Sequence, residues 1–256
     1  MNGMRNSVRR QARTLAAIAA MALVWEFGAP AIGIPDYVLP VPSVILLRFW
    51  ATLPAQAEHL TVTALTTIAG LAMAMLAGVL LALLVIYVAP LKAVVLSALG
   101  AFNGIPKIAI APLFVIWFGL GYQPKVLLAF LMSLFPIVVG AVSGLGEVEP
   151  DILDLAKLSG GSEWRIFRRV RLMHALPFLA DAVKVAFPLA LVGSIVGEFI
   201  GGNRGVGYLI LSGQFNLDTP LVFACLLSIT MFTSLAIGAV VMFEEVFLAW
   251  RPSRRR

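Results

Sequence analysis

The sequence predicts an all-α integral membrane protein that crosses the bilayer six times. Of its 256 residues, 61% are hydrophobic and only 12% are charged, which leaves too little polar surface to keep a globular fold soluble. Six stretches reach or approach the roughly 20 apolar residues that a helix needs to cross the hydrocarbon. The single cysteine, Cys225, lies inside an apolar run, so we expect neither an intrachain disulfide nor a thiolate metal cluster.

The six predicted spans cover residues 15–34, 60–89, 93–120, 126–146, 176–197 and 219–243. The fourth and sixth contain no charged residue and give the clearest signal. Glu26, together with glycine and proline residues, interrupts the first. Pro106 and Lys107 lie near the middle of the third, which predicts a kink or a later start. Basic residues precede the first span as in a signal peptide, but no A-x-A cleavage site follows, so we interpret it as a retained helix.

Lysine and arginine residues indicate the orientation, because they are retained on the cytoplasmic side during insertion. With both termini in the cytoplasm, the inner segments hold fourteen of them, whereas the outer loops hold only Arg48, Lys125 and Arg204. We therefore expect a basic cytoplasmic N-terminus at 1–14, a single membrane domain at 15–250 with a cytoplasmic loop at 147–176, and a basic cytoplasmic tail at 251–256. An interfacial helix is expected after the turn at Pro40 and Pro42.

The net charge of +6 does not indicate a nucleic-acid partner. The basic residues flank apolar spans, where anionic lipid and insertion topology account for them. Membrane lipid is therefore the expected partner of these charges. His59 and His174 are expected in separate loops on opposite sides of the membrane, which argues against a metal site and against a histidine base for a serine nucleophile.

The longest polar stretch is EPDILDLAKLSGGSEWRIFRRVRLMHALP, residues 149–177. Pro150 and the acids beside it favour a helix start, and Gly160 and Gly161 favour its end in a left-handed conformation. Charge at the bilayer centre costs about 2.5–3.5 kcal/mol per residue, so this many charges stay together only where they meet water or another protein. We interpret the stretch as a docking surface; the other reading is an ordinary amphipathic inner loop.

A second helix is expected after these glycines. Ser162 can cap it, and Trp164 and Phe167 would share one face. Its four arginines, Arg165, Arg168, Arg169 and Arg171, would offer charge to lipid phosphates or to a partner. Pro177 is expected to open the fifth span.

The spacing within this stretch resembles that of a known family. Asp154, Ala156 and Gly160, followed by Phe167, Val170, Leu172 and Pro177, are similar to the EAA loop of the membrane subunits of ATP-binding cassette importers. The segments LPVPS at 39–43, GIPKIAIAPLFVIWFGLG at 104–121, FPIVVGAVSGL at 135–145 and VGEFIGGNRGVGYLI at 196–210 resemble the nitrate, taurine and alkanesulfonate permeases among them. Two positions depart from the pattern: Leu155 replaces the first alanine, and Met173 stands where a proline commonly follows the leucine.

The resemblance implies a type I importer permease fold, with a cytoplasmic coupling helix between the fourth and fifth membrane helices. The residues that it assigns to ATPase coupling are Asp154, Leu155, Ala156, Lys157, Gly160 and Gly161. It further implies a homodimer in a bacterial inner membrane, two copies of a cytoplasmic ATP-binding subunit and an external solute-binding protein. The chain has no G-x-x-x-x-G-K-[ST] phosphate loop, so we expect no ATPase site and no cofactor of its own; ATP and Mg would be used by the partner.

Polar residues inside or beside the spans are candidates for the translocation pathway, because they must face a cavity or find partners. These are Asn103, Lys107, Asp181, Lys184 and Glu198. Asp181 and Lys184 can also form a local ion pair. Lys107, which has no evident local partner, could attract an anion or anchor near the headgroups; Glu198 could gate or be solvated at the interface. Asn203 and Arg204, in the glycine-rich stretch 201–207, are expected to contact the binding protein or to form a flexible outer turn.

The sequence therefore predicts the permease subunit of an ATP-driven importer, which is not itself an enzyme. The expected solute is a small organic or inorganic anion such as a sulfonate, nitrate or a carboxylate. The alternative is a secondary transporter that works without an ATPase, driven by protons through Glu26, Asp181 and Glu198.

Overall fold

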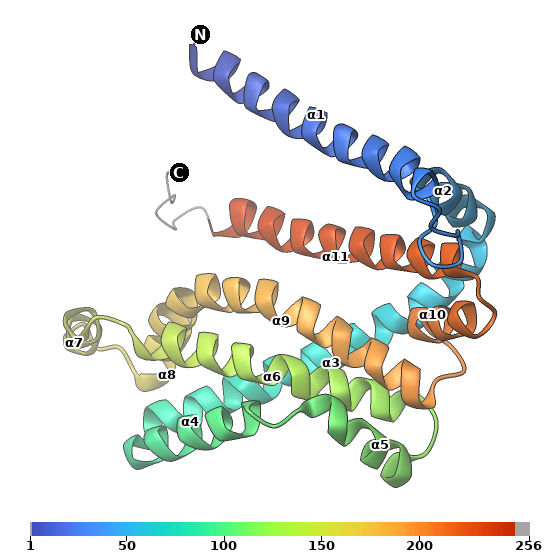
Figure 1. Ribbon diagram of the computed structural model, residues 1–256. Helices are drawn as coiled ribbons and strands as arrows, with labels where there is room; N and C mark the ends of the chain where they lie inside the picture. The colour runs from blue at the N-terminus through green and yellow to red at the C-terminus, as the bar shows by residue number, and fades with distance from the viewer. Residues whose placement is uncertain (1, 249–256) are drawn as a thin grey trace. The chain divides into compact units, whose positions relative to one another are not determined.

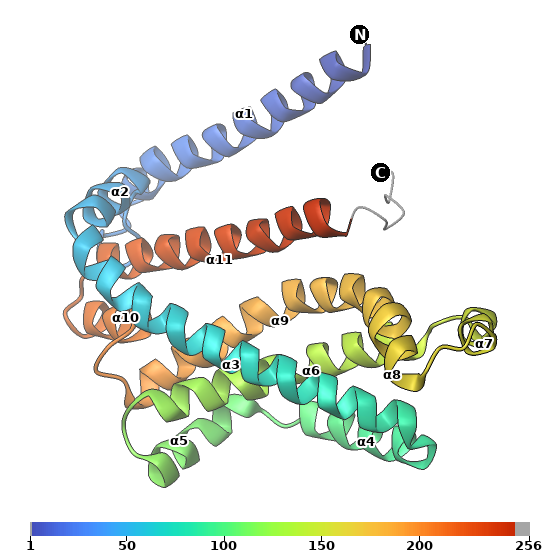
Figure 2. The same cartoon turned by 180° about the vertical axis from the view of Figure 1, so that it is seen from behind.

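The computed structural model describes residues 2–248, and every regular element in that part of the chain is a helix (Figures 1 and 2). The elements are α1 (Asn2–Ala31), α2 (Pro42–Ala51), α3 (Leu53–Tyr87), α4 (Ala89–Asn103), α5 (Lys107–Phe118), α6 (Tyr122–Gly146), α7 (Pro150–Leu158), α8 (Glu163–Ile166), a π-helical turn (Phe167–Arg171), α9 (Leu172–Gly201), α10 (Val206–Phe215) and α11 (Thr219–Phe247). The basic tail expected at 251–256 lies outside the described residues.

Within residues 2–248, four continuous helices are long and apolar enough to cross a membrane. They are α3, α6, α11 and the run Glu163–Gly201, which joins α8, the π-helical turn and α9. The pair α4 and α5 gives a fifth candidate, whereas the apolar part of α1, Ala16–Ala31, is shorter. The all-α class is thus confirmed, while the count of six spans is not.

The third predicted span, 93–120, is not one helix. It divides into α4 and α5, which meet at an angle of 89°. Pro106 explains the break, because a proline has no backbone N–H and keeps the residue before it out of the helical region. Lys107, the first residue of α5, donates from Nζ to Asn103 Oδ1 at 2.7 Å, so the expectation that it has no local partner was wrong.

The expectation that Pro177 opens the fifth span was also wrong, because this proline lies inside α9. A proline removes one backbone hydrogen bond, but it does not end a helix whose flanks are held by packing. On either side of Pro177, Ala175 and Ala182 of α9 contact Gly144 and Gly140 of α6. The helix therefore continues from the polar stretch 149–177 into the apolar run that follows.

The chain forms two compact units. One comprises the residues up to Glu58 together with Leu209–Ile229. Within it α2 is the expected helix after the Pro40 and Pro42 turn, and Glu26 accepts hydrogen bonds from the Ser43 amide at 3.0 Å and the Ser43 hydroxyl at 2.6 Å. A carboxylate is stabilised at a helix N-terminus, which explains an acid in the first predicted span.

The second unit comprises His59–Tyr208 and the chain from Thr230 onward, and its centre is the antiparallel pair α6 and α9 (Figure 1). Each helix carries two glycines four residues apart, Gly140 and Gly144 on α6 and Gly193 and Gly197 on α9. A methyl group on any of the four would stand within 2.9 Å of the other helix. Small residues at this spacing let two membrane helices bring their backbones together.

Candidate functional site

Helix α7 lies beyond the ends of α6 and α9, and none of its residues is buried (Figures 1 and 2). Ile152, Leu155 and Leu158 recur every three residues, and they are 46%, 66% and 87% exposed. A helix normally covers such an apolar face with a neighbour. Asp151 and Asp154 on the same short helix are exposed as well. α7 therefore presents an apolar stripe with acidic side chains beside it.

The end of α7 has the geometry predicted from its two glycines. Gly160 has φ +75°, its N–H donates to the Lys157 carbonyl, and the Gly161 N–H donates to the Ala156 carbonyl, both at 3.0 Å. This pair of bonds around a left-handed residue is the Schellman motif. A methyl group on Gly161 would meet the Ala156 carbonyl oxygen at 2.6 Å. Gly160 is needed for its conformation and Gly161 for the close approach.

The segment after α7 is bonded back to α6. Ser162 caps α8 as predicted, accepting from the Arg165 amide at 3.4 Å, and the rings of Trp164 and Phe167 stack. Arg171, one of the four arginines expected to offer charge to lipid or to a partner, donates to the Leu145 carbonyl at 2.8 Å. This bond ties the entry of α9 to the end of α6, so both ends of the α7 loop are anchored.

His174 adds a second bond at the same place. It lies within α9 and not in a loop as expected, and its Nδ1 donates to the Gly144 carbonyl at 2.7 Å. Together with the Arg171 bond, it fixes the position of α9 against the last turn of α6. A displacement of α7 would therefore move α6 and α9 together.

At the opposite end of the pair, Glu198 is fully buried, which corrects the expectation of interfacial solvation. Its carboxylate accepts hydrogen bonds from the Thr63 hydroxyl and the Gly207 amide, both at 2.8 Å. The Thr63 hydroxyl in turn accepts from the Val206 amide at 2.8 Å. Paired in this way, the buried carboxylate holds the glycine-rich stretch 201–207, called here the stretch after α9, against α3. The expected flexible turn is thus bonded at its C-terminal side.

His59 makes a further contact with this stretch from within α3, again not from a loop. The Gly205 amide donates to His59 Nδ1 at 3.0 Å, and the imidazole stacks on the Tyr208 ring. Gly205 has φ +117°, and a methyl group there would stand 2.1 Å from the Glu198 carboxylate carbon. Only glycine fits this position.

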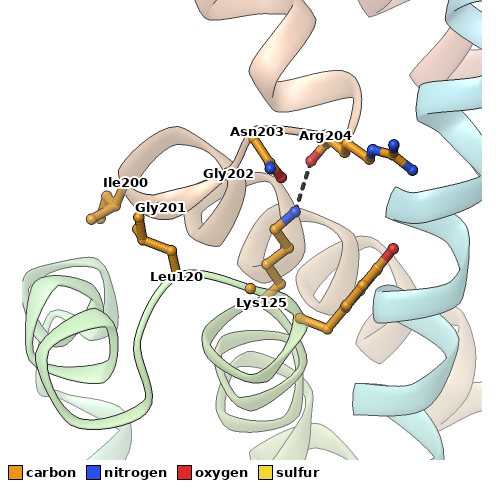
Figure 3. Close-up of a pocket in the computed structure, with 9 residues that line it drawn as sticks. Leu120, Lys125, Ile200, Gly201, Gly202, Asn203 and Arg204 are labelled. Atoms are coloured by element: carbon orange, nitrogen blue, oxygen red, sulfur yellow. Dashed lines mark hydrogen bonds between the residues drawn. The ribbon is translucent and has the colours of Figure 1, made fainter.

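A pocket of about 560 Å³ opens beside this stretch (Figure 3). Lys125 points into it from α6, only 3% exposed, and donates from Nζ to the Arg204 carbonyl at 2.7 Å. Lys125 was expected in an outer loop, but it lies in the first turn of α6. Asn203 and Arg204 line the same pocket and are exposed, so they remain available to a partner.

A groove of about 530 Å³ runs along the contact of α6 with α9. Asn103 and Asp181, two of the predicted pathway residues, both line it. Lys184 pairs with Asp181 at 3.2 Å, which confirms the expected local pair, and it also pairs with Glu244 of α11. Glu198 does not line this groove. The structure thus brings only part of the predicted pathway set together.

Comparison with known proteins shows to which family the chain belongs. Residues 74–246 match the family model described as "Binding-protein-dependent transport system inner membrane component". The chain belongs to this family. It is 32% identical to the formylaminopyrimidine transport permease protein ThiX of Halalkalibacterium halodurans, covering 91% of this chain and 94% of that protein. It is 27% identical to the putative aliphatic sulfonates transport permease protein SsuC of Escherichia coli K12, over 90% and 88% of the two chains.

Among solved structures, the chain resembles a chain of the MetNI methionine ABC transporter in inward-facing conformations. The TM-score is 0.55 at 22% identity, and the match covers 75% of this chain and 96% of that chain. This likeness confirms the importer permease fold. The resemblance read from the sequence to importer permeases, including the sulfonate group, is confirmed by the family and its relatives.

Sequence reasoning did not single out Thr63 of this permease, and it missed the partners of Lys125 and Arg171. Thr63, Lys125 and Arg171 act on backbone groups far away in the chain, so no local pattern marks them. The glycine pairs of α6 and α9 did carry a signal, since glycines four residues apart in an apolar helix indicate close helix packing.

Proposed function

We propose that this permease forms the translocation pathway of an ATP-driven importer in a bacterial inner membrane, and that α7 receives the movement of the ATPase. The observation that carries the proposal is the exposed apolar face of α7 on a segment anchored at both ends. An apolar helix face of this kind fits a groove on a partner protein. The chain lacks a phosphate loop of its own, so the partner supplies ATP hydrolysis with its Mg.

The coupling step follows from the bonds around α7. When two ATPase subunits close on ATP, each would displace the α7 that is seated on it. Arg171 and His174 bond α9 to the end of α6, so the displacement passes to both helices as one body. Asp154, beside the apolar stripe, would meet a basic group on the ATPase, which is worth about 1 kcal/mol if the pair stays exposed.

The proposed assembly contains two copies of this chain, two ATP-binding subunits and an external solute-binding protein. With α7 in the cytoplasm, the pocket of Lys125, Asn203 and Arg204 faces outward, because it lies at the opposite ends of α6 and α9. Asn203 and Arg204 are then placed to contact the binding protein. Both chain termini would lie in the cytoplasm, which accords with their arginines.

The solute belongs to one of two chemical classes. The sequence predicts a small anion, such as a sulfonate, nitrate or a carboxylate. The sulfonate permease among the relatives supports this class. The formylaminopyrimidine permease among the relatives supports the second class, a heteroaromatic solute. The two classes differ in charge, so the ionisable residues along the pathway discriminate between them.

A proton-driven transporter without an ATPase is not favoured. Each acid assigned to proton transfer makes a local structural contact instead, since Glu26 bonds Ser43, Glu198 holds the stretch after α9, and Asp181 pairs with Lys184. The family also depends on a binding protein, as its description states.

The test compares Gly160→Pro and Asp154→Lys in proteoliposomes that hold the ATPase subunit and the binding protein. Proline fixes φ near −65° and has no N–H, so it cannot replace Gly160 at φ +75°. We expect both variants to insert normally, to keep hydrolysing ATP and to lose uptake. Glu163→Lys, the same type of charge reversal on α8, is the matched control and keeps uptake. Full uptake in both variants would remove the coupling role from α7.

A further inference from the structure

We propose that the pocket beside the stretch after α9 is an oxyanion site, which binds a small dissolved ion such as sulfate, phosphate or a sulfonate. This pocket, called here the outer pocket, measures about 560 Å³, and Lys125, Asn203 and Arg204 line it (Figure 3). Its volume lies within the range of about 300–1,000 Å³ that small-molecule sites occupy. The inference goes beyond the proposed function, because it concerns a ligand of the outer pocket and not the identity of the transported solute.

Lys125 carries a buried ammonium group whose donors are not all used. The residue is 3% exposed, and its Nζ donates to the Arg204 carbonyl at 2.7 Å. An ammonium group has three N–H donors. The described residues provide no second hydrogen-bond acceptor and no ion pair for it; the Tyr122 ring, with its centroid 5.7 Å from Nζ, adds a cation–π contact. Because unsatisfied buried donors are costly, a ligand that brings acceptor oxygens is stabilised here.

Arg204 adds a second positive charge to the outer pocket. Its side chain is exposed and forms no ion pair with another described residue. Figure 3 shows its carbonyl directed toward Lys125 and its guanidinium group directed away. An exposed side chain changes rotamer within nanoseconds, so the guanidinium group is able to turn toward a bound ion. Arginine has five donors and no acceptor, in a planar fork that matches oxyanions.

The charges around the outer pocket do not cancel. No acid is among its lining residues in the described part of the chain. Glu198 is fully buried and attracts Lys125 electrostatically, but its two oxygens accept from the Thr63 hydroxyl and the Gly207 amide. Counting Glu198 against Lys125 leaves Arg204 with no counter-ion among the described residues. An oxyanion supplies this counter-ion, whereas a cation is repelled.

Asn203 supplies a third donor. Its side chain is exposed, and Figure 3 shows its amide group on the same side of the pocket as the Lys125 ammonium group. The NH₂ group of an asparagine donates to an oxyanion. Lys125 belongs to α6, whereas Asn203 and Arg204 belong to the stretch after α9. An ion that accepts from all three residues therefore joins these two segments, beside the bond that Lys125 already makes.

The test measures the binding of radiolabelled sulfate to the full chain in phosphatidylcholine nanodiscs by scintillation proximity. We expect saturable binding that unlabelled phosphate and methanesulfonate displace. Tetramethylammonium chloride at the same ionic strength should not displace the label, because it screens charge without offering acceptor oxygens. A lack of saturable binding, or equal displacement by tetramethylammonium chloride, would overturn the inference.

Three variants locate the binding. Lys125→Met keeps the length of the side chain without its ammonium group, so we expect the sulfate affinity to fall at least about tenfold. Arg204→Gln should lower the affinity about threefold or more, and this variant of an exposed residue folds even where Lys125→Met does not. Lys92→Gln is the matched control, because Lys92 is exposed and lies outside the pocket, and it should keep the affinity within about twofold. An unchanged affinity in Arg204→Gln, or in folded Lys125→Met, would place the sulfate elsewhere and refute the site.

The same variants distinguish other sources of an anionic group. If a lipid headgroup filled the outer pocket, native mass spectrometry would show less phosphatidylglycerol retained by Arg204→Gln than by the unaltered chain. If an acidic side chain of the binding protein filled it, that protein would dock more weakly on Arg204→Gln. Either result without sulfate binding would overturn the proposal of a dissolved ligand. The sulfate measurement needs neither ATP nor a partner subunit, so its failure would leave the coupling role of α7 standing.

Discussion

Replacing Gly193 by alanine tests the close contact of α6 and α9 on which the proposed coupling depends. The added methyl group would stand 2.5 Å from the Leu128 carbonyl oxygen and 2.8 Å from the Ala129 amide nitrogen. Non-bonded atoms prefer separations of about 3.5–4.0 Å, so the helices would have to move apart by about 1 Å. The contacted atoms belong to the backbone and cannot rotate away as a flexible side chain would.

The change in the free energy of unfolding caused by Gly193→Ala follows from two opposing effects. Overpacking costs about 1–3 kcal/mol, and we expect the upper part of this range because backbone must move. Alanine offsets about 1 kcal/mol through its higher helix propensity. The net loss is about 1–2 kcal/mol, which lowers the unfolding midpoint by about 2–8 °C for a chain of this size.

The measurement is thermal unfolding in detergent followed by far-ultraviolet circular dichroism. Gly100→Ala is the matched control, because Gly100 lies in helix α4 and nothing stands within 4 Å of an added methyl group. Helix propensity alone then acts, and the midpoint should rise by about 1–4 °C. If Gly193→Ala raised the midpoint as Gly100→Ala does, the two helices could not be packed backbone to backbone.

Two further predictions concern the stretch after α9. Thr63→Val keeps the shape of the side chain but removes the acceptor of the Val206 amide, so hydrogen exchange at that amide should become about tenfold faster; an unchanged rate would contradict the bond. Gly205→Ala would place a methyl group 2.1 Å from the Glu198 carboxylate carbon, so this stretch should open and trypsin should cleave after Arg204 at least about tenfold faster, whereas resistance equal to that of the unaltered chain would count against the described geometry.

The α7 loop could be predicted in detail from the sequence because its structure is local. Pro150, Gly160 and Ser162 act on backbone groups within a few residues of themselves, and the helix start, the left-handed turn and the cap all appear where expected. The break at Pro106 was expected as a kink for the same reason. Its angle of 89° was not, because packing around a break decides how far a helix turns.

The long-range partners of two charged residues, Lys125 and Arg171, could not be predicted in this way. Lys125 was placed in a loop and Arg171 on a charged surface, because a positive charge is usually retained outside the hydrocarbon. Each instead donates to a carbonyl oxygen that is dozens of residues away. Composition shows that such a charge needs a partner; only the fold shows which partner it has.

By itself the sequence determined that this is a helical membrane protein, that it belongs with the importer permeases, and where helix α7 and its glycine turn begin and end. These properties follow from hydropathy, charge distribution and short-range backbone preferences, which are summed along the chain. The tertiary structure decided that glycines of α6 and α9 touch, that Glu198 holds the stretch after α9, and that Asn103, Phe178 and Asp181 share one groove. Contacts of this kind depend on how helices pack, and many packings are compatible with the same apolar pattern.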